Sequence, residues 1–225
     1  RVEGPAAREL FFHCQPPADI AEPHRQAEAI YRGIVAVLEG EGGGFASVVS
    51  ETVFLRNLRA SIESVRDARH GVLAAHGVTS HRPATTEIEQ PPLNEHACLE
   101  VMLQAVIPNE SPARVELIET RSAFSCAECA GARGLRLHLG DETRFHAAAL
   151  CGPGDTAYEQ TLGMFALAED LLQKAGMEFR DVVRTWIHLR DIDRDYADLN
   201  RARREFFRTR RIDPVPASTG IGGGP

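Results

Sequence analysis

The sequence has few cysteines, no long apolar run and no excess of positive charge. Its five cysteines are an odd, scattered number in 225 residues, which favours free thiols in a reducing compartment over a disulfide framework. No apolar run approaches the roughly 18 residues of a membrane-spanning helix. A net charge of -7 argues against non-specific nucleic-acid binding. We therefore expect a cytoplasmic protein without a membrane or nucleic-acid partner.

The residues that commonly bind metals do not form a recognisable ligand set. Cys126 and Cys129 make a C-x-x-C pair, but no second pair follows at the spacing of a zinc site. His138 or His146 would join them only through tertiary folding. A redox role needs such a pair at a helix start, whereas the local pattern here is that of a strand or loop. We expect no metal and no cofactor.

The chain does contain an internal repeat. Its period exceeds 100 residues and is therefore too long for a solenoid, whose units run to about 20–50 residues. It indicates two copies of one small domain, which we predict at residues 1–110 and 111–225. The aligned pairs include Gln26 with Gln160, Gly42 with Gly176, Phe45 with Phe179, and Leu55-Arg56 with Leu189-Arg190.

Each copy has two segments with the apolar spacing of a helix face. The first helix of copy one has Pro23 near its start and ends at Gly40, and its counterpart runs from Tyr158 to Lys174. The second helices are predicted over 61–76 and 195–208. The stripe of the first helix consists of Ala27, Ile30, Tyr31, Ile34, Val35 and Leu38.

Strands are predicted around these helices. Alternating β-branched and apolar residues indicate strands at 47–55 and 181–189, followed in copy one by strands at 86–89 and 97–106. Shorter patterns indicate strands at 10–14, 145–151, 122–126 and 135–139. This order predicts an α+β protein in which both helices of a copy cover one face of its sheet.

The motifs of copy two, in their order along the chain, resemble the RidA/YjgF family. The matching residues are Gln160-Thr161, Gly176, Asp181-Val182-Val183, Leu189-Arg190-Asp191, Asn200, Phe206-Phe207 and Pro216-Ala217. Copy one is a more diverged version that retains Leu99-Glu100-Val101. The resemblance implies two tandem RidA-like (chorismate-mutase-like) domains, each a mixed sheet with two helices on one face. It also implies trimers with ligand clefts between domains.

Family members hydrolyse enamines or imines, and the resemblance implies where the reacting groups lie. A Glu on the last strand places the attacking water, a role that falls on Glu100. An Arg directly after Pro-Ala holds the substrate carboxylate, but this chain has Thr85 and Ser218 there, followed by Thr86 and Thr219. A hydroxyl offers only a neutral hydrogen bond. We expect the last strand of copy two, with its counterpart of Glu100, to lie beyond Pro225.

A second resemblance is confined to the end of the sequence. Pro216-Ala217-Ser218-Thr219-Gly220-Ile221-Gly222-Gly223 resembles a segment of the chorismatases, which release pyruvate from chorismate and consist of two RidA-like halves. In that reading, Gly220 and Gly222 let backbone N–H groups approach an anionic ligand. The alternative is a flexible turn between strands.

Other candidate residues have both a functional and a structural interpretation. Arg56 and Arg190 repeat at a strand end and either replace the missing cation or form a structural salt bridge. Cys151-Gly152 lies where the family has a segment lining the cleft. Glu100 is either a catalytic or ligand-orienting group at a cleft, or a strand-edge carboxylate that lies in solvent or pairs with Arg56 or Arg69.

Three functions follow from these patterns. The first is a divergent RidA-superfamily hydrolase acting on an enamine, imine or enol-ether acid in a cleft between domains. The second is a chorismatase-like enzyme, and the third is a non-catalytic ligand-binding protein. In each case the expected partners are a small anionic metabolite and further copies of the chain, with three chains giving six domains in two stacked rings.

Overall fold

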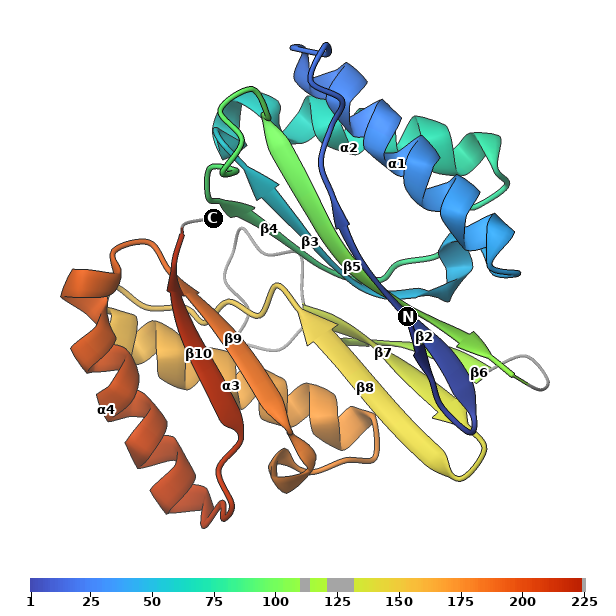
Figure 1. Cartoon of the computed structure of the whole chain (residues 1–225). Coiled ribbons are helices and arrows are strands. Elements are labelled where there is room, and N and C mark those ends of the chain that lie inside the picture. The colour runs from blue at the N-terminus through green and yellow to red at the C-terminus, as the bar shows by residue number, and fades with distance from the viewer. Residues whose placement is uncertain (110–113, 121–131, 224–225) are drawn as a thin grey trace. The chain divides into compact units, whose positions relative to one another are not determined.

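The computed structural model describes residues 1–109, 114–120 and 132–223 (Figure 1). The predicted strand at 122–126 and the Cys126–Cys129 pair lie outside these residues. The chain divides into two compact units. Unit 1 comprises Arg1–Val115 and Leu137–His146, and unit 2 comprises Glu116–Arg136 and Ala147–Gly224.

Unit 1 is a mixed β-sheet with a layer of two helices. Its strands have the order β1-β2-β5-β3-β4, in which β3 and β4 are parallel and the other neighbours antiparallel. Figure 1 shows α1 and α2 side by side over one face of this sheet. The elements are β1 (Val2–Glu3), β2 (Ala7–Cys14), α1 (Pro23–Gly40), β3 (Val48–Leu55), α2 (Leu58–Ala75), β4 (Ala84–Glu89) and β5 (Leu99–Pro108).

Helix α1 forms where its sequence pattern predicts. All six residues of the predicted stripe are buried, and they pack into one core with residues of α2, β3 and β5. The side chain of Glu22 accepts hydrogen bonds from two backbone N–H groups of the first turn, and Pro23 occupies that turn. Gly42, just beyond the helix end, has φ +77°, a conformation that favours glycine.

The second face of the unit 1 sheet carries no helix of its own unit. Successive side chains of a strand point to opposite faces, so Leu10 and Val101 enter the core while Phe11 and Met102 remain 59% and 47% exposed. We call this second side the open face. Strand register assigns to it Phe11, His13, Thr52, Phe54, Thr86, Glu100 and Met102.

Unit 2 repeats the helix pair and the parallel strand pair. Strands β9 and β10 are parallel, and the aromatic rings of Phe165, Phe179, Phe206 and Phe207 pack together in its core. A further sheet has the order β6-β7-β8. The elements of unit 2 are α3 (Ala157–Lys174), β9 (Arg184–Leu189), α4 (Ile192–Arg210) and β10 (Ala217–Gly222). The strands of the further sheet, β6 (Arg114–Thr120), β7 (Ala132–Leu139) and β8 (Glu142–Ala148), are divided between the two units.

Two predicted strands of unit 2 have different bounds in the structure. The segment predicted at 181–189 begins only at Arg184, because Phe179–Asp181 forms a 3-10 turn closed by hydrogen bonds within it. The strand predicted at 145–151 is Glu142–Ala148. Within the described residues of unit 2, β9 pairs only with β10, whereas its counterpart β3 pairs with both β4 and β5. A membrane-crossing helix would have to be longer or more apolar than any helix of the described chain.

Candidate functional site

Glu100 is a nearly buried carboxylate at the start of β5. Its side chain is only 10% exposed, and both of its oxygens make hydrogen bonds. Oε2 lies 3.0 Å from Nε2 of His13, and Oε1 accepts a 2.8 Å bond from Nε2 of Gln15. The His13 side chain is 52% exposed. These three residues, which we call the Glu100 cluster, join a buried negative charge to an accessible imidazole.

The pairing of β2 with β5 brings the Glu100 cluster together. His13 lies opposite Met102 and Cys14 opposite Val101, so Glu100 lies between His13 and Gln15 on the open face. Cys14 points the other way and packs against the core of unit 1. Burial raises the pKa of its thiol to about 11, which disfavours the nucleophilic thiolate. Of the two residues, His13 is therefore the one whose side chain is available to react with a ligand.

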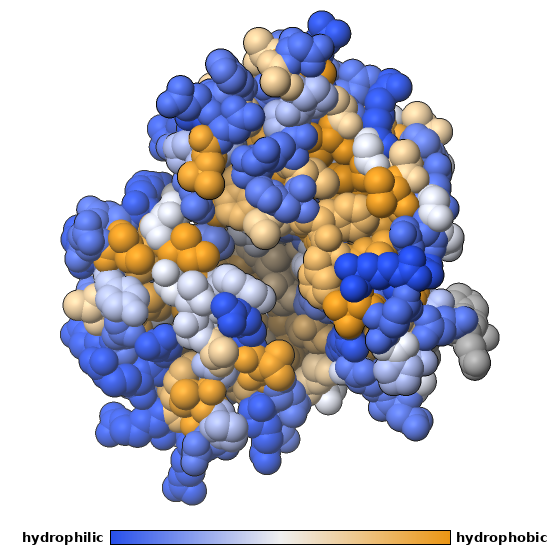
Figure 2. Space-filling view, viewed as in Figure 1, coloured by the Kyte–Doolittle hydropathy of each residue, from blue (hydrophilic) through white to orange (hydrophobic). Residues whose placement is uncertain are grey.

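Apolar residues surround the Glu100 cluster on the open face. Phe54 is the register partner of Glu100 on β3, and the exposed Phe11 and Met102 flank His13. Figure 2 shows that apolar residues, in orange, are exposed among the hydrophilic ones on the side of the molecule in view. A small ligand on this face would contact both the polar cluster and apolar side chains.

The two threonines after Pro83-Ala84 point to opposite faces of the sheet. Thr85 pairs in register with Glu51 and donates a 3.1 Å hydrogen bond to its Oε2 inside the helix-covered layer. Thr86 pairs with Thr52, which pairs with Met102, so it belongs to the open face. Of these two predicted substrate-binding residues, only Thr86 shares a face with Glu100.

Thr85 belongs to a buried polar network around Glu51. The Glu51 side chain has no exposed surface and accepts bonds from Arg69 Nη2 at 2.9 Å and from the Tyr31 hydroxyl at 2.7 Å. Burial and the adjacent carboxylate raise the pKa of Tyr31 well above its ordinary value. Arg69 also lies over the ring of Phe45. Because its members satisfy one another, we interpret this network as structural.

Arg56 stabilises the connection between β4 and β5. Its Nε donates to the Ala97 carbonyl at 3.0 Å, and its Nη2 donates to the Asn94 carbonyl at 2.9 Å. The alternative in which Glu100 pairs with Arg56 or Arg69 is not what the structure shows, because Arg56 donates to loop carbonyls and Arg69 to Glu51. The repeat counterpart of Arg56, Arg190, is exposed directly after β9.

The predicted residues at the end of unit 2 lie in a strand and not in a turn. In β10, Ser218 pairs with Thr185 and Gly220 with Ile187, and an added Cβ at Gly220 would approach the Tyr196 ring of α4 to 3.1 Å. An added Cβ at Gly222 would also meet α4, at Ile192. Both glycines therefore permit close packing of helix on strand. Thr219 is on the other face and accepts a 3.0 Å bond from Arg184.

Gly152 likewise permits a close backbone approach. A Cβ at this position would come within 2.5 Å of the Met164 backbone nitrogen and would also collide with the Gln160 carbonyl, both in α3. The neighbouring Cys151 is half-buried. The structure thus gives a packing reason for Gly152.

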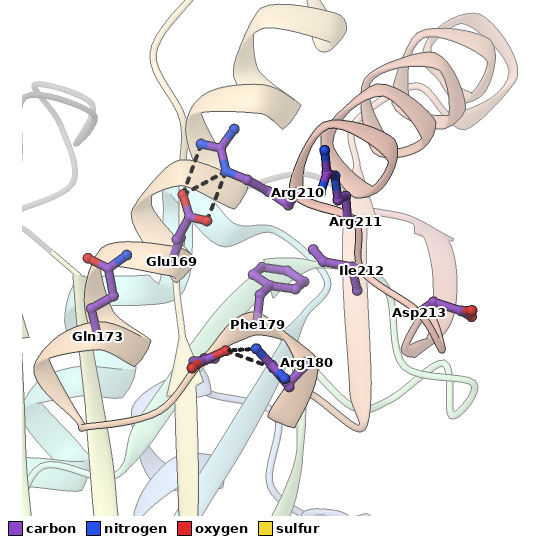
Figure 3. Close-up of a pocket in the computed structure, with 9 residues that line it drawn as sticks. Glu169, Gln173, Phe179, Arg180, Arg210, Arg211, Ile212 and Asp213 are labelled. Atoms are coloured by element: carbon purple, nitrogen blue, oxygen red, sulfur yellow. Dashed lines mark hydrogen bonds and ion pairs between the residues drawn. The ribbon is translucent and has the colours of Figure 1, made fainter.

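A surface cavity of about 590 Å³ lies in unit 2, lined by α3, the 3-10 turn and the end of α4. Figure 3 shows Arg210 reaching across it to Glu169, at 2.9 Å. Arg180 pairs with Glu178 at its edge. None of the predicted site residues lines this cavity. Within the described residues, no group of three or more His, Cys, Asp or Glu side chains is placed to hold a metal ion.

Sequence reasoning missed His13 and Gln15 as partners of Glu100. His13 lies on β2 and Gln15 directly follows that strand, two residues further along the chain, a spacing that brings both side chains to Glu100. That spacing was the available signal. The strand of Glu100 is more than 80 residues away in the chain, with the hydrogen bonds spanning 87 and 85 positions. Only the pairing of β2 with β5 makes them neighbours.

Comparison with known proteins finds similarity to one family. The model of the family described as endoribonuclease L-PSP matches residues 146–223, about a third of the chain. No curated protein matches the sequence. The match supports the predicted RidA/YjgF resemblance for the second copy and does not extend to β2 or β5.

Several solved structures are similar to part of this chain. A putative translation initiation inhibitor from Salmonella typhimurium is 21% identical, with 44% of this chain and 82% of that chain covered and a TM-score of 0.39. The YjgF gene product of E. coli is 22% identical, with 44% and 80% covered and a TM-score of 0.39. E. coli TdcF with bound serine is 19% identical, with 47% and 84% covered and a TM-score of 0.40.

Proposed function

We propose that this chain is a divergent RidA-superfamily hydrolase of small molecules, with the Glu100 cluster of unit 1 as its centre of proton transfer. The family match supports a role in processing or binding a small molecule. The observation that carries the enzymatic proposal is the nearly buried Glu100 carboxylate hydrogen-bonded to a half-exposed imidazole. Burying a carboxylate costs free energy unless it is hydrogen-bonded, and here one of the bonding partners is a half-exposed imidazole that can exchange protons with a ligand.

Hydrolysis of an imine requires only proton transfers in addition to water. The water oxygen bonds to the carbon of C=N while the electron pair of that bond moves to nitrogen. One proton leaves the water, and protons reach the nitrogen before the C–N bond breaks to release ammonia and a carbonyl compound. A side chain that takes up and returns protons therefore accelerates both steps, typically by about 10²–10⁴-fold.

The open face offers a substrate carboxylate neutral donors in place of a guanidinium. Thr86 contributes a hydroxyl on the same face as Glu100, whereas Thr85 is bonded to Glu51. A neutral hydrogen bond is about half as strong as a charge-assisted one. We therefore expect weak binding of 2-imino acids, with a high KM, and tolerance of substrates without a carboxylate.

We also propose that the chain is a tandem pair of related domains that assembles into a trimer. Three features that occur in both halves of the chain support the tandem arrangement. They are a pair of helices, a pair of parallel strands, and a glycine of positive φ after the first helix, with φ +77° at Gly42 and +73° at Gly176. Large apolar side chains that remain exposed away from the open face, among them Val183 and Trp186, support association. Multi-angle light scattering should give three times the chain mass, and a monomer at micromolar concentration would refute the trimer.

An activity assay tests the enzymatic proposal. The protein is incubated with a freshly generated 2-imino acid and, separately, with chorismate, and release of ammonia or pyruvate is followed. We expect ammonia from the imine, with the rate reduced at least 100-fold in Glu100→Gln. Glu39→Gln removes another carboxylate that contacts a histidine and serves as the matched control. Pyruvate from chorismate would favour the chorismatase-like function, and inactivity on both substrates would favour ligand binding alone.

A further inference from the structure

We propose that Nδ1 of His13 is the atom that transfers the proton, and that Glu100 is a positioning residue acting through it. This inference rests on the proposed hydrolase function and assigns roles within the Glu100 cluster. It differs from the role that the sequence implied, in which the carboxylate itself places the attacking water.

The carboxylate is poorly placed to meet a substrate directly. The Glu100 side chain is 10% exposed and each of its oxygens already has a hydrogen-bond partner, in His13 and Gln15. The His13 side chain, in contact with the carboxylate, is 52% exposed. A water molecule or imine therefore reaches the ring of His13 more readily than the oxygens of Glu100.

The hydrogen bonds determine which nitrogen can act as the base. Neutral imidazole has one N–H donor and one acceptor nitrogen. Because an ionised carboxylate only accepts, Nε2 of His13 carries the hydrogen that is donated to Oε2 of Glu100. The lone pair is then on Nδ1, at the other side of the ring. Gln15 fixes the carboxylate by donating to Oε1, which keeps Oε2 directed at His13.

The proton balance closes within one turnover. As the water oxygen bonds to the imine carbon, Nδ1 takes a proton from that water and His13 becomes an imidazolium beside the Glu100 carboxylate. That proton then passes to the nitrogen and gives a carbinolamine. Nδ1 next takes the proton of the carbinolamine hydroxyl and delivers it to the same nitrogen, so that the C–N bond breaks with its electron pair on nitrogen and the carbonyl forms. Ammonia departs and His13 is neutral again. Glu100 stays ionised throughout and stabilises the transient positive charge.

Another histidine–glutamate pair in unit 1 serves as an internal comparison. His76 Nδ1 lies 3.1 Å from Glu39 Oε1, but both side chains are exposed at the ends of α2 and α1. Solvent screens such a pair, and its geometry is not enforced by a sheet. His76→Gln is therefore the matched control for a substitution of His13.

The test combines kinetics with chemical rescue, using the full chain and a 2-imino acid as substrate. We expect His13→Ala to lower kcat by about 10²–10⁴-fold with a small change in KM, and added imidazole to restore kcat in a concentration-dependent way. Glu100→Gln should also lower kcat, and the double variant should be no slower than His13→Ala alone, because both residues act through one step. His76→Gln should retain the wild-type rate.

The outcomes separate the inference from the function on which it rests. An active wild type in which His13→Ala keeps its rate while Glu100→Gln loses it would overturn the inference and leave the hydrolase proposal standing. Loss of activity in His13→Ala without rescue by imidazole, while His13→Gln remains active, would also overturn it. A wild type that releases neither ammonia nor pyruvate would overturn both proposals. Circular dichroism of each variant verifies that it is folded.

Discussion

Replacing Arg69 with Met should strongly destabilise unit 1. The substitution leaves the Glu51 carboxylate, which has no exposed side-chain surface, with only the neutral hydroxyls of Tyr31 and Thr85 as partners. Removing one member of a buried ion pair typically costs about 3–5 kcal/mol, because the other charge remains buried. Glu51 keeps two neutral hydrogen-bond donors, and the Arg69 side chain is 12% exposed. We therefore expect a loss of unfolding free energy at the lower end of this range, about 3 kcal/mol.

Chemical denaturation followed by circular dichroism measures this loss in the free energy of unfolding. The matched control is Arg66→Met, since Arg66 bonds Glu87 and Glu63 at the surface with a side chain 45% exposed. Exposed pairs contribute about 0–1 kcal/mol. Because the double variant Glu51→Thr/Arg69→Met also removes the buried carboxylate, it should recover most of the loss. If Arg69→Met and Arg66→Met destabilise equally, the network is not a buried ion pair and the reasoning fails.

Three further predictions concern pH, packing and thiol reactivity. Burial and the nearby Arg69 lower the pKa of His81 in the folded state. The contribution of neutral His81 to folding stability is therefore fully present above its unfolded pKa of about 6.5, and it is lost as pH falls and the unfolded chain takes up the proton more readily. Wild-type protein should therefore lose more stability than His81→Gln between about pH 7 and pH 5, and equal losses would contradict this. Gly152→Ala should destabilise the protein by about 1–3 kcal/mol, because the added Cβ overlaps with α3. Gly71→Ala, where the added Cβ meets open space in α2, should stabilise it by up to about 1 kcal/mol. Denaturation midpoints that move in the same direction for both variants would contradict this prediction. Because its pKa is raised to about 11, Cys14 should react with iodoacetamide at pH 8 far more slowly than the same thiol in urea, as mass spectrometry of labelled peptides would show.

The helices and several strands of this protein could be predicted because their signals are local. The stripe of α1 repeats every three to four residues, and its caps, Pro23 and the glycines after it, lie within one turn of its ends. The α+β class follows from the order of such segments. Strand bounds were less accurate where a 3-10 turn precedes β9 and where β10 contains glycines that had also been interpreted as a turn. Those outcomes depend on packing against α3 and α4.

The sequence by itself determined which residues carry chemistry, and only the tertiary structure decided which of them meet. Glu100 was predicted as a strand carboxylate of functional interest, but its bonding to His13 and Gln15 depends on the register of β2 against β5. Thr85 and Thr86 are adjacent in the chain, yet the register of β4 places one beside Glu51 in the core and the other on the open face. A register is set by long-range pairing and by which face is buried, and a shift of one residue would exchange the two faces.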